Sequence, residues 1–110
     1  MDFRQLDDNV AVAAQITPAD VSKIAEAGFR SIICNRPDSE EGAYPHDEVE
    51  AAATAAGLEF HFLPVVSGQI TEANVRDMAS TLESAAKPTL AYCRSGTRCT
   101  NLYSLVSQLA

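Results

Sequence analysis

The chain has 110 residues, 46% of them hydrophobic and 21% charged, and this balance predicts one folded domain over residues 1–110. The formal net charge of −7 at pH 7 argues against nucleic acid or an anionic membrane as a partner, because both attract clustered lysine and arginine. No apolar run approaches the roughly 20 residues of a membrane span, and the N-terminus lacks the layout of a signal peptide, so we expect a cytoplasmic protein.

Short apolar segments alternate along the chain with segments that carry helix signals. In chain order the sequence predicts a strand at 9–15, a helix at 17–28, a strand at 29–35, a helix at 46–57, a strand at 58–65, a helix at 71–86, a strand at 89–93 and a last helix around 102–109. Thr17 and Thr71 are good N-caps, and Gly28 and Gly57 can end helices. The alternation predicts a three-layer α/β/α fold with a mainly parallel sheet of four to five strands.

The motif CRSGTR, residues 93–98, joins the last predicted strand to the last predicted helix. Ligands of parallel α/β folds bind beyond the carboxyl ends of the strands, so this motif is the candidate site. The free N–H groups of a helix N-terminus favour an anion, and here they predict a lowered pKa for the Cys93 thiol. Cys93 is therefore the predicted nucleophile and Arg98 its catalytic partner. The predicted anion-binding residues are Arg94, Ser95, Gly96 and Thr97.

Three further side chains are secondary candidates. Asp38 could supply an acid and Arg36 could contact the substrate, although a turn residue and a structural arginine are the simpler interpretations. Cys99 either packs in the core or serves as a resolving thiol for a modified Cys93. The three cysteines lack paired CxxC spacing and only two histidines are present, so the sequence predicts no metal site and no cofactor.

Three blocks, GFRSIICNRPDSE, AAGLEFHFLPVVSGQITEANV and AYCRSGTRCTNLYSL, together resemble the beta-lactamase-hydrolase-like phosphatase family. This is a small bacterial-type domain related to dual-specificity phosphatases and also found fused to persulfide dioxygenases. The resemblance covers nearly the whole chain. It implies a protein-tyrosine-phosphatase-like α/β fold with the cysteine loop as active site. Members have been described both as phosphatases and as sulfurtransferases, so the resemblance leaves the reaction open.

Two features bear on that reaction. Cysteine phosphatases carry a Cys-x5-Arg loop, whereas CRSGTR has one residue fewer between Cys93 and Arg98 and resembles the rhodanese pattern Cys-Arg-x-Gly-x-Arg. Dual-specificity phosphatases also use an aspartate upstream of the cysteine, and the corresponding stretch FLPVVSGQIT contains no acid. Both features favour a rhodanese-like sulfurtransferase that carries sulfane sulfur on Cys93.

The predicted sulfurtransferase takes sulfur from a small anionic donor and passes it to a thiol or cyanide, with a persulfide-metabolism enzyme as a partner. The first alternative is a cysteine-dependent phosphatase that forms a phosphocysteine on Cys93 from a phosphoester. The second is a non-catalytic module that senses an anion or a persulfide.

Overall fold

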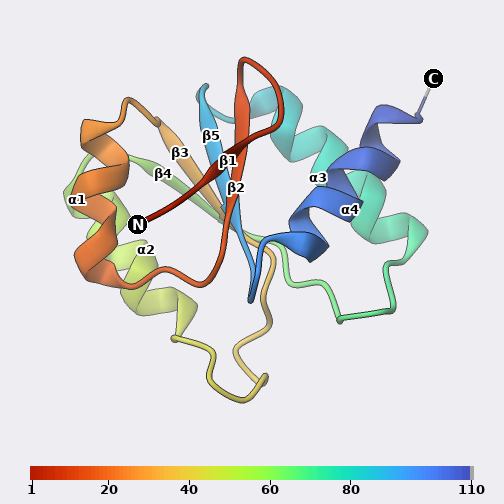
Figure 1. Cartoon of the computed structure of the whole chain (residues 1–110), viewed down its shortest axis with the longest axis horizontal. Coiled ribbons are helices and arrows are strands. Elements are labelled where there is room, and N and C mark those ends of the chain that lie inside the picture. Colours follow the sequence, from red (N-terminus) through yellow and green to blue (C-terminus); the bar gives the residue numbers. More distant parts are fainter. Residues whose placement is uncertain (110) are drawn as a thin grey trace.

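The computed structural model describes residues 1–109 and places a five-stranded sheet between two pairs of helices (Figure 1). In chain order the elements are β1 (Arg4–Gln5), β2 (Val10–Ala13), α1 (Pro18–Glu26), β3 (Ser31–Cys34), α2 (His46–Ala55), β4 (Glu59–Phe62), α3 (Glu72–Ser84), β5 (Thr89–Tyr92) and α4 (Thr97–Ser107). Ala110, the last residue of the predicted domain, lies outside the described residues.

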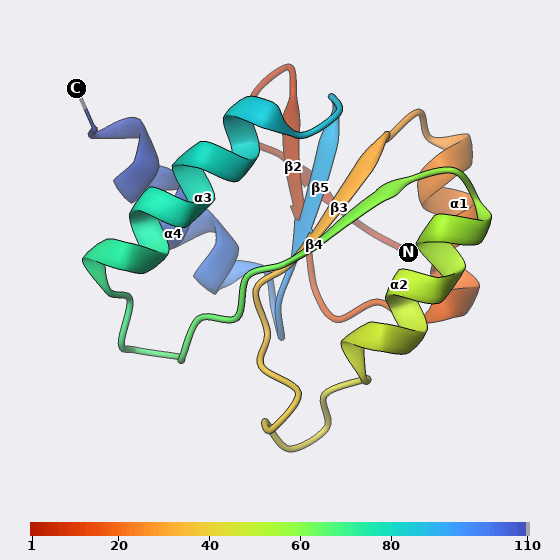
Figure 2. The ribbon, with the colours of Figure 1, turned by 180° about the vertical axis from the view of Figure 1, so that it is seen from behind.

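The strands lie in the order β1-β2-β5-β3-β4, and every neighbouring pair is parallel except β1 and β2. Helices α1 and α2 cover one face of the sheet and α3 and α4 cover the other (Figures 1 and 2). The predicted three-layer, mainly parallel α/β/α fold is confirmed. The two residues of β1 are exposed and carry no apolar pattern, so no sequence pattern predicted this antiparallel edge.

The core lies on both faces of the sheet, because β2, β3 and β5 are buried at all four of their positions. Successive side chains of a strand point to opposite faces. Ile32 and Leu90 accordingly pack toward α1 and α2, while Ile33 and Ala91 join Leu102 of α4 on the other face. Strands buried on both faces are continuously apolar, and this is the pattern that the sequence shows.

The helix boundaries follow local chemistry. The backbone N–H of Thr17 donates to the Asp20 carboxylate at 2.9 Å, and the Thr71 hydroxyl accepts from the backbone N–H of Asn74 at 3.1 Å. These contacts satisfy donors that the first turn of a helix leaves free. Among residues 1–109, no helix is both long and apolar enough to cross a membrane.

Backbone hydrogen bonds tie the loop after β5 to the end of the neighbouring strand β2. The backbone N–H of Cys93 donates to the Ala13 carbonyl at 3.3 Å, and the Gln15 N–H donates to the Arg94 carbonyl at 3.2 Å. Gly96 has a φ of 89°, and a Cβ atom there would lie 3.5 Å from the Ala13 carbonyl group. The left-handed turn therefore requires glycine here, whereas an added Cβ atom would make only an ordinary van der Waals contact with β2.

Candidate active site

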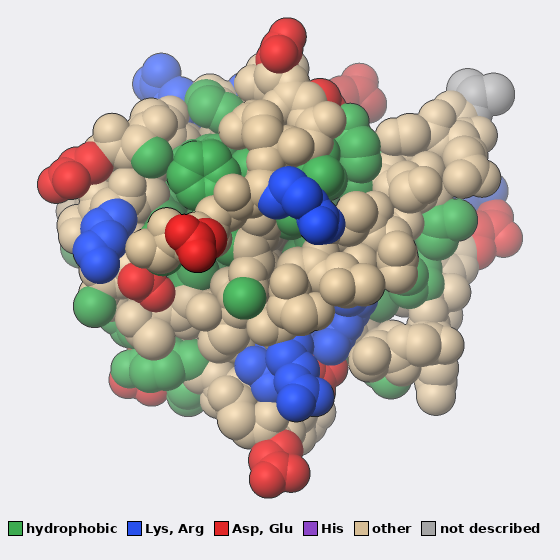
Figure 3. All heavy atoms as spheres, in the orientation of Figure 1, with side chains coloured by type: hydrophobic (Ala, Val, Ile, Leu, Met, Phe, Trp, Pro, Cys, Tyr) green, Lys and Arg blue, Asp and Glu red, His purple; other side chains and the backbone are tan. Residues whose placement is uncertain are grey.

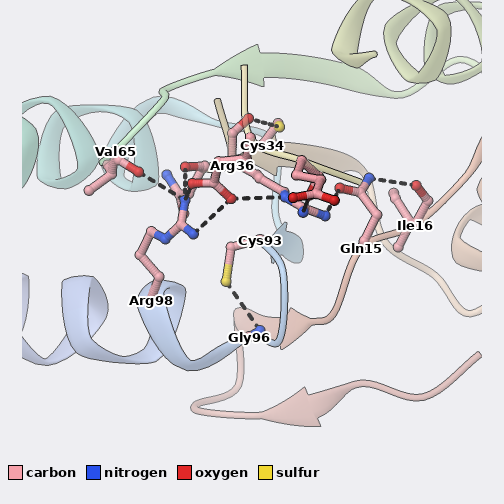
Figure 4. Close-up of polar contacts among 11 residues, drawn as sticks. Gln15, Ile16, Cys34, Arg36, Val65, Cys93, Gly96 and Arg98 are labelled. Atoms are coloured by element: carbon pink, nitrogen blue, oxygen red, sulfur yellow. Dashed lines mark hydrogen bonds and ion pairs between the residues drawn. The ribbon is translucent and has the colours of Figure 1, made fainter. Parts of the chain in front are cut away.

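The Cys93 side chain lies at the base of a cavity of about 750 Å³ beyond the carboxyl ends of the strands. Its sulfur accepts a hydrogen bond from the backbone N–H of Gly96 at 3.1 Å and points toward that residue (Figure 4). Only 1% of Cys93 is exposed. The cavity is lined by Cys93, Arg94, Ser95, Thr97 and Arg98 of the loop and first helical turn, by Asn101 of α4, and by Ser67, Gly68 and Ile70 from the segment after β4.

The pKa of Cys93 is lowered to about 5, so its sulfur is a thiolate at neutral pH. The largest cause is a hydrogen bond that the Cys99 thiol donates to this sulfur. Burial opposes the shift, and the backbone N–H groups of Cys99, Ser95 and Gly96 add to it. By contrast, burial raises the pKa of the Cys34 thiol, which packs in the core below α2. Of these thiols, Cys93 has the chemistry of a nucleophile.

Cys99 is fully buried and acts here as a hydrogen-bond donor to its neighbour. Replacing Cys99 by alanine removes that donor, so the pKa of Cys93 is expected to rise by about one pH unit or more. Iodoacetamide labelling of Cys93, followed by peptide mass over a pH series, measures the shift. In the unchanged protein the labelling rate falls as the pH drops through about 5. Cys99→Ser keeps a donor and should stay close to the unchanged protein; equal behaviour of the two variants would contradict this role.

Arg98 is anchored by three groups from two loops. Its guanidinium donates to the Val65 carbonyl at 2.9 Å, more weakly to the Asn35 carbonyl at 3.4 Å, and forms an ion pair with Glu40 at 2.8 Å. Glu40 also pairs with Arg36 at 3.0 Å. Although burial opposes ionisation of Glu40, its hydrogen bonds to Arg98 and Arg36 lower the pKa of its carboxyl group. Figure 4 shows the Arg98 guanidinium turned toward Val65 and the Arg36 side chain on the other side of the cluster.

This cluster carries an excess of positive charge beside the cavity. The guanidinium groups of Arg98 and Arg36 both pair with the single carboxylate of Glu40. The Arg98 side chain is 9% exposed and the Arg36 side chain 5% exposed. The Nε atom of Arg98 is buried, and within residues 1–109 it finds no hydrogen-bond partner. Buried donors are normally satisfied. The protein groups around Arg98 therefore leave its guanidinium incompletely paired.

The other loop residues divide between two tasks. Arg94, Ser95 and Thr97 are exposed and line the cavity, and the Ser95 hydroxyl donates to the Thr97 hydroxyl at 3.1 Å. Gly96 is buried and directs its N–H at the Cys93 sulfur, so it stabilises the charge of the Cys93 thiolate. Figure 3 shows basic side chains gathered at the end of the molecule where the strands finish.

The two secondary candidates after β3 lie outside the cavity lining. The Asp38 carboxylate accepts from the backbone N–H of His46 at 3.0 Å and contacts the His46 ring at 2.7 Å, which places it at the start of α2. Arg36 is buried and bonds to Gln15 and to the Glu41 carbonyl besides Glu40. Arg36 therefore reaches a ligand only through its effect on the cluster. Within the described part of the chain, no group of three His, Cys, Asp or Glu side chains could hold a metal ion.

Several residues in and beside the cavity escaped the sequence reasoning. Glu40 is separated from Arg98 by 58 positions, and no spacing rule connects a loop carboxylate with a helix that forms so far downstream. The segment 67–70 was noted for its lack of an acid, but not as part of the cavity lining. Its position there depends on the path of the chain after β4, which no local pattern predicts. Asn101 follows Arg98 by three residues, a spacing that puts both on one helix face and could have found it.

The chain matches the family model of the phosphatase-like domain of beta-lactamase hydrolase-like proteins over residues 2–110. A beta-lactamase hydrolase-like protein of Agrobacterium fabrum (strain C58 / ATCC 33970) is 38% identical over 102 residues, which are 92% of this chain and 24% of that protein. The chain spans about a quarter of the length of the curated relatives it matches.

Solved structures show the same fold. A candidate phosphatase of Neisseria meningitidis Z2491 has a TM-score of 0.85 and 37% identity, and the match covers 94% of this chain and 74% of that one. The TpbA protein of P. aeruginosa, solved with bound pTyr, has a TM-score of 0.72 at 17% identity, covering 96% of this chain and 64% of that one. The expected protein-tyrosine-phosphatase-like fold is confirmed.

The predicted rhodanese-like sulfurtransferase is wrong: the family model and the 37% identical structure are both phosphatase-like. The sulfur donor and the persulfide-metabolism partner rested on that activity and lose their basis. The prediction rested on the short loop between Cys93 and Arg98 and on the missing upstream acid, and the loop length proved a poor guide to the bound group. In the structure the cavity is bounded also by the segment 67–70 and by α4, so the residue count of one loop does not set its size.

Proposed function

We propose that this chain, which belongs to the family of the phosphatase-like domain of beta-lactamase hydrolase-like proteins, is a cysteine-dependent phosphatase acting on an anionic phosphoryl compound. The observation that carries the proposal is the Cys93 thiolate, with a pKa of about 5, at the base of a cavity lined by Arg94 and Arg98. A low-pKa thiolate beside guanidinium groups is suited to attack phosphorus while its oxygens stay anionic.

In the first step the Cys93 sulfur attacks the phosphorus atom. The P–S bond forms as the P–O bond to the leaving group breaks, and the electron pair of that bond departs on the leaving oxygen. The charge of the transferring group is spread over its three other oxygens. The Arg98 and Arg94 side chains and the hydroxyl groups of Ser95 and Thr97 line the cavity and supply the donors for these oxygens.

In the second step water attacks the phosphorus of the phosphocysteine. The P–S bond breaks, its electron pair returns to Cys93, and inorganic phosphate leaves together with the proton that water loses to solvent. The Cys99 thiol and the N–H group of Gly96 stabilise the returning thiolate, as they do in the resting state. The same contacts that activate the nucleophile therefore also make it a good leaving group.

The test is phosphate release from 4-nitrophenyl phosphate, combined with acid quenching and peptide mass analysis of the protein during turnover. We expect steady hydrolysis and a phosphoryl group on Cys93. Cys34→Ala is the matched control, because Cys34 lies in the core on the α2 side and should leave both signals unchanged. Absence of hydrolysis and of phosphocysteine in folded, reduced protein would contradict the proposal.

The three free thiols suit a reducing compartment, and we place the protein in the cytoplasm.

Glu40 is proposed as a positioning residue, because its carboxylate joins the Arg98 and Arg36 side chains without lining the cavity. Glu40→Gln keeps the shape but replaces an ion pair by neutral hydrogen bonds. We expect kcat to fall by about 10-fold, with a smaller change in KM, because Arg98 loses its fixed orientation in the transition state. Steady-state kinetics gives the two constants separately. Glu41→Gln is the control, since only the backbone carbonyl of Glu41 contacts the cluster; equal losses in both variants would contradict the role.

A further inference from the structure

The wall of the Cys93 cavity, as far as residues 1–109 form it, contains no group suited to protonating a departing alkoxide. Its polar members are hydroxyl, amide and guanidinium groups and the nucleophile itself, and none of its residues is a carboxylic acid or a histidine. Serine and threonine hydroxyls and arginine are poor acids at neutral pH. A general acid contributes about 10²- to 10⁴-fold in rate where it is present, so its absence decides which substrates react.

The carboxyl groups around the cavity are engaged elsewhere. Glu40 is held as a carboxylate by two guanidinium groups, which is the wrong protonation state for an acid. Asp38 is bonded twice to His46 at the start of α2. Glu72, the first acidic residue after the cavity segment, accepts two hydrogen bonds from Arg76 at one carboxylate oxygen on the surface of α3. The site is therefore built around positive charge and lacks a proton donor.

From this wall we infer that the site cleaves phosphoryl compounds whose leaving group departs unprotonated, namely acyl phosphates, phosphoanhydrides and activated aryl phosphates, and does not cleave alkyl phosphate esters. The inference rests on the proposed phosphatase function and specifies its substrate class. Carboxylates, with a pKa of about 4, and phosphates, with a second pKa of about 6, are stable anions at neutral pH. An alkoxide is nearly as basic as hydroxide and needs a proton to leave.

The electron balance of the step agrees with this class. When the P–O bond of an acyl phosphate breaks, its electron pair stays on a carboxylate oxygen and no proton has to be delivered. The attacking Cys93 thiolate is itself a weak base, because Cys99 and the loop N–H groups stabilise its charge. A weakly basic sulfur can therefore displace a weakly basic oxygen without an uphill step. An unprotonated alkoxide is a much stronger base than this sulfur, so it would attack the phosphocysteine and take the phosphoryl group back.

The experiment compares substrates of similar shape that differ in the basicity of the leaving group. 4-Nitrophenyl, phenyl and benzyl phosphate are tested with acetyl phosphate, and kcat/KM is taken from phosphate release at one pH, corrected for release without protein. We expect acetyl and 4-nitrophenyl phosphate to react, and benzyl phosphate to react at least 10²-fold more slowly than phenyl phosphate. If the kcat/KM values for phenyl and benzyl phosphate lie within about threefold of each other, the inference is overturned while the phosphatase function stands. No release from any substrate and no phosphocysteine would overturn both.

A gain-of-function pair at the cavity rim gives a second measurement. Ser67 is exposed and lines the cavity opposite the loop, so Ser67→Asp offers a carboxyl group there, while Ser67→Asn offers the same shape without a titrating proton. We expect Ser67→Asp to narrow the gap between phenyl and benzyl phosphate by about 10-fold or more, and Ser67→Asn to leave it unchanged. An unchanged gap in both folded variants, or an equal narrowing in both, would count against a missing acid as the cause.

Discussion

Replacing Cys93 by serine is expected to lower kcat for 4-nitrophenyl phosphate by about 10⁴- to 10⁶-fold, the largest effect of any single change in this chain. The serine hydroxyl is almost fully protonated at neutral pH, whereas the Cys93 thiol has a pKa of about 5 and is ionised. The contacts from Cys99 and Gly96 that stabilise a thiolate do not suffice to ionise a hydroxyl group.

The measurement is steady-state phosphate release together with a binding assay. Binding of inorganic phosphate, measured by calorimetry, should persist in Cys93→Ser because the cavity arginines remain. Loss of turnover with retained binding separates a missing nucleophile from a misfolded site. Activity within about tenfold of the unchanged protein would show that another group attacks the phosphorus, and that Cys93 has a different task.

Replacing Arg98 by lysine is expected to lower kcat/KM by about 10²- to 10³-fold. Lysine keeps the charge, but its three donors sit on one nitrogen, so it cannot match the planar guanidinium that spans Val65 and Glu40 beside the cavity. Lysine is preferred to alanine because Arg98→Ala would leave buried acceptors in two loops unpaired, at about 1–3 kcal/mol each, and could unfold the site.

Arg94→Lys is the matched control for this change. Arg94 is exposed at the cavity rim, and its charge is screened by water, so the same replacement should lower kcat/KM by about tenfold or less. Thermal unfolding of each variant checks that the fold is intact. Equal losses at both positions would mean that only the charge near the cavity matters and that the anchoring of Arg98 by Glu40 and Val65 has no catalytic value.

The predicted elements of the sheet were correct where local chemistry is strong. Buried parallel strands are short apolar runs, and the helix between 17 and 28 begins with the Thr17 cap and stops at Gly28, which has a φ of 99°. The edge strand β1 was not assigned, because Arg4 and Gln5 are exposed, carry no apolar pattern and pair over only two residues with the following strand β2.

The candidate site divides in the same way. A cysteine between a strand and a glycine-containing helix start is a pattern of adjacent residues that indicates an activated thiol. The sequence therefore identified Cys93 as the predicted nucleophile and predicted its lowered pKa. The Cys99 thiol as the main cause of that shift was not foreseen, since a buried cysteine in a helix normally signals core packing. Asp38 was considered as an acid from its place in the chain, yet the structure joins it to His46.

The sequence by itself determined the layered fold and singled out Cys93 and the loop 94–98 as candidate nucleophile and anion-binding residues. Each of these depends on residues that are neighbours in the chain or repeat at a helical or strand period. Tertiary structure alone decided what that loop faces. It brought Glu40 and Val65 to Arg98, set the segment 67–70 across the cavity and turned Asp38 away from it. These contacts join loops from three different strands, and the distance between such loops depends on how the sheet orders its strands rather than on any local pattern.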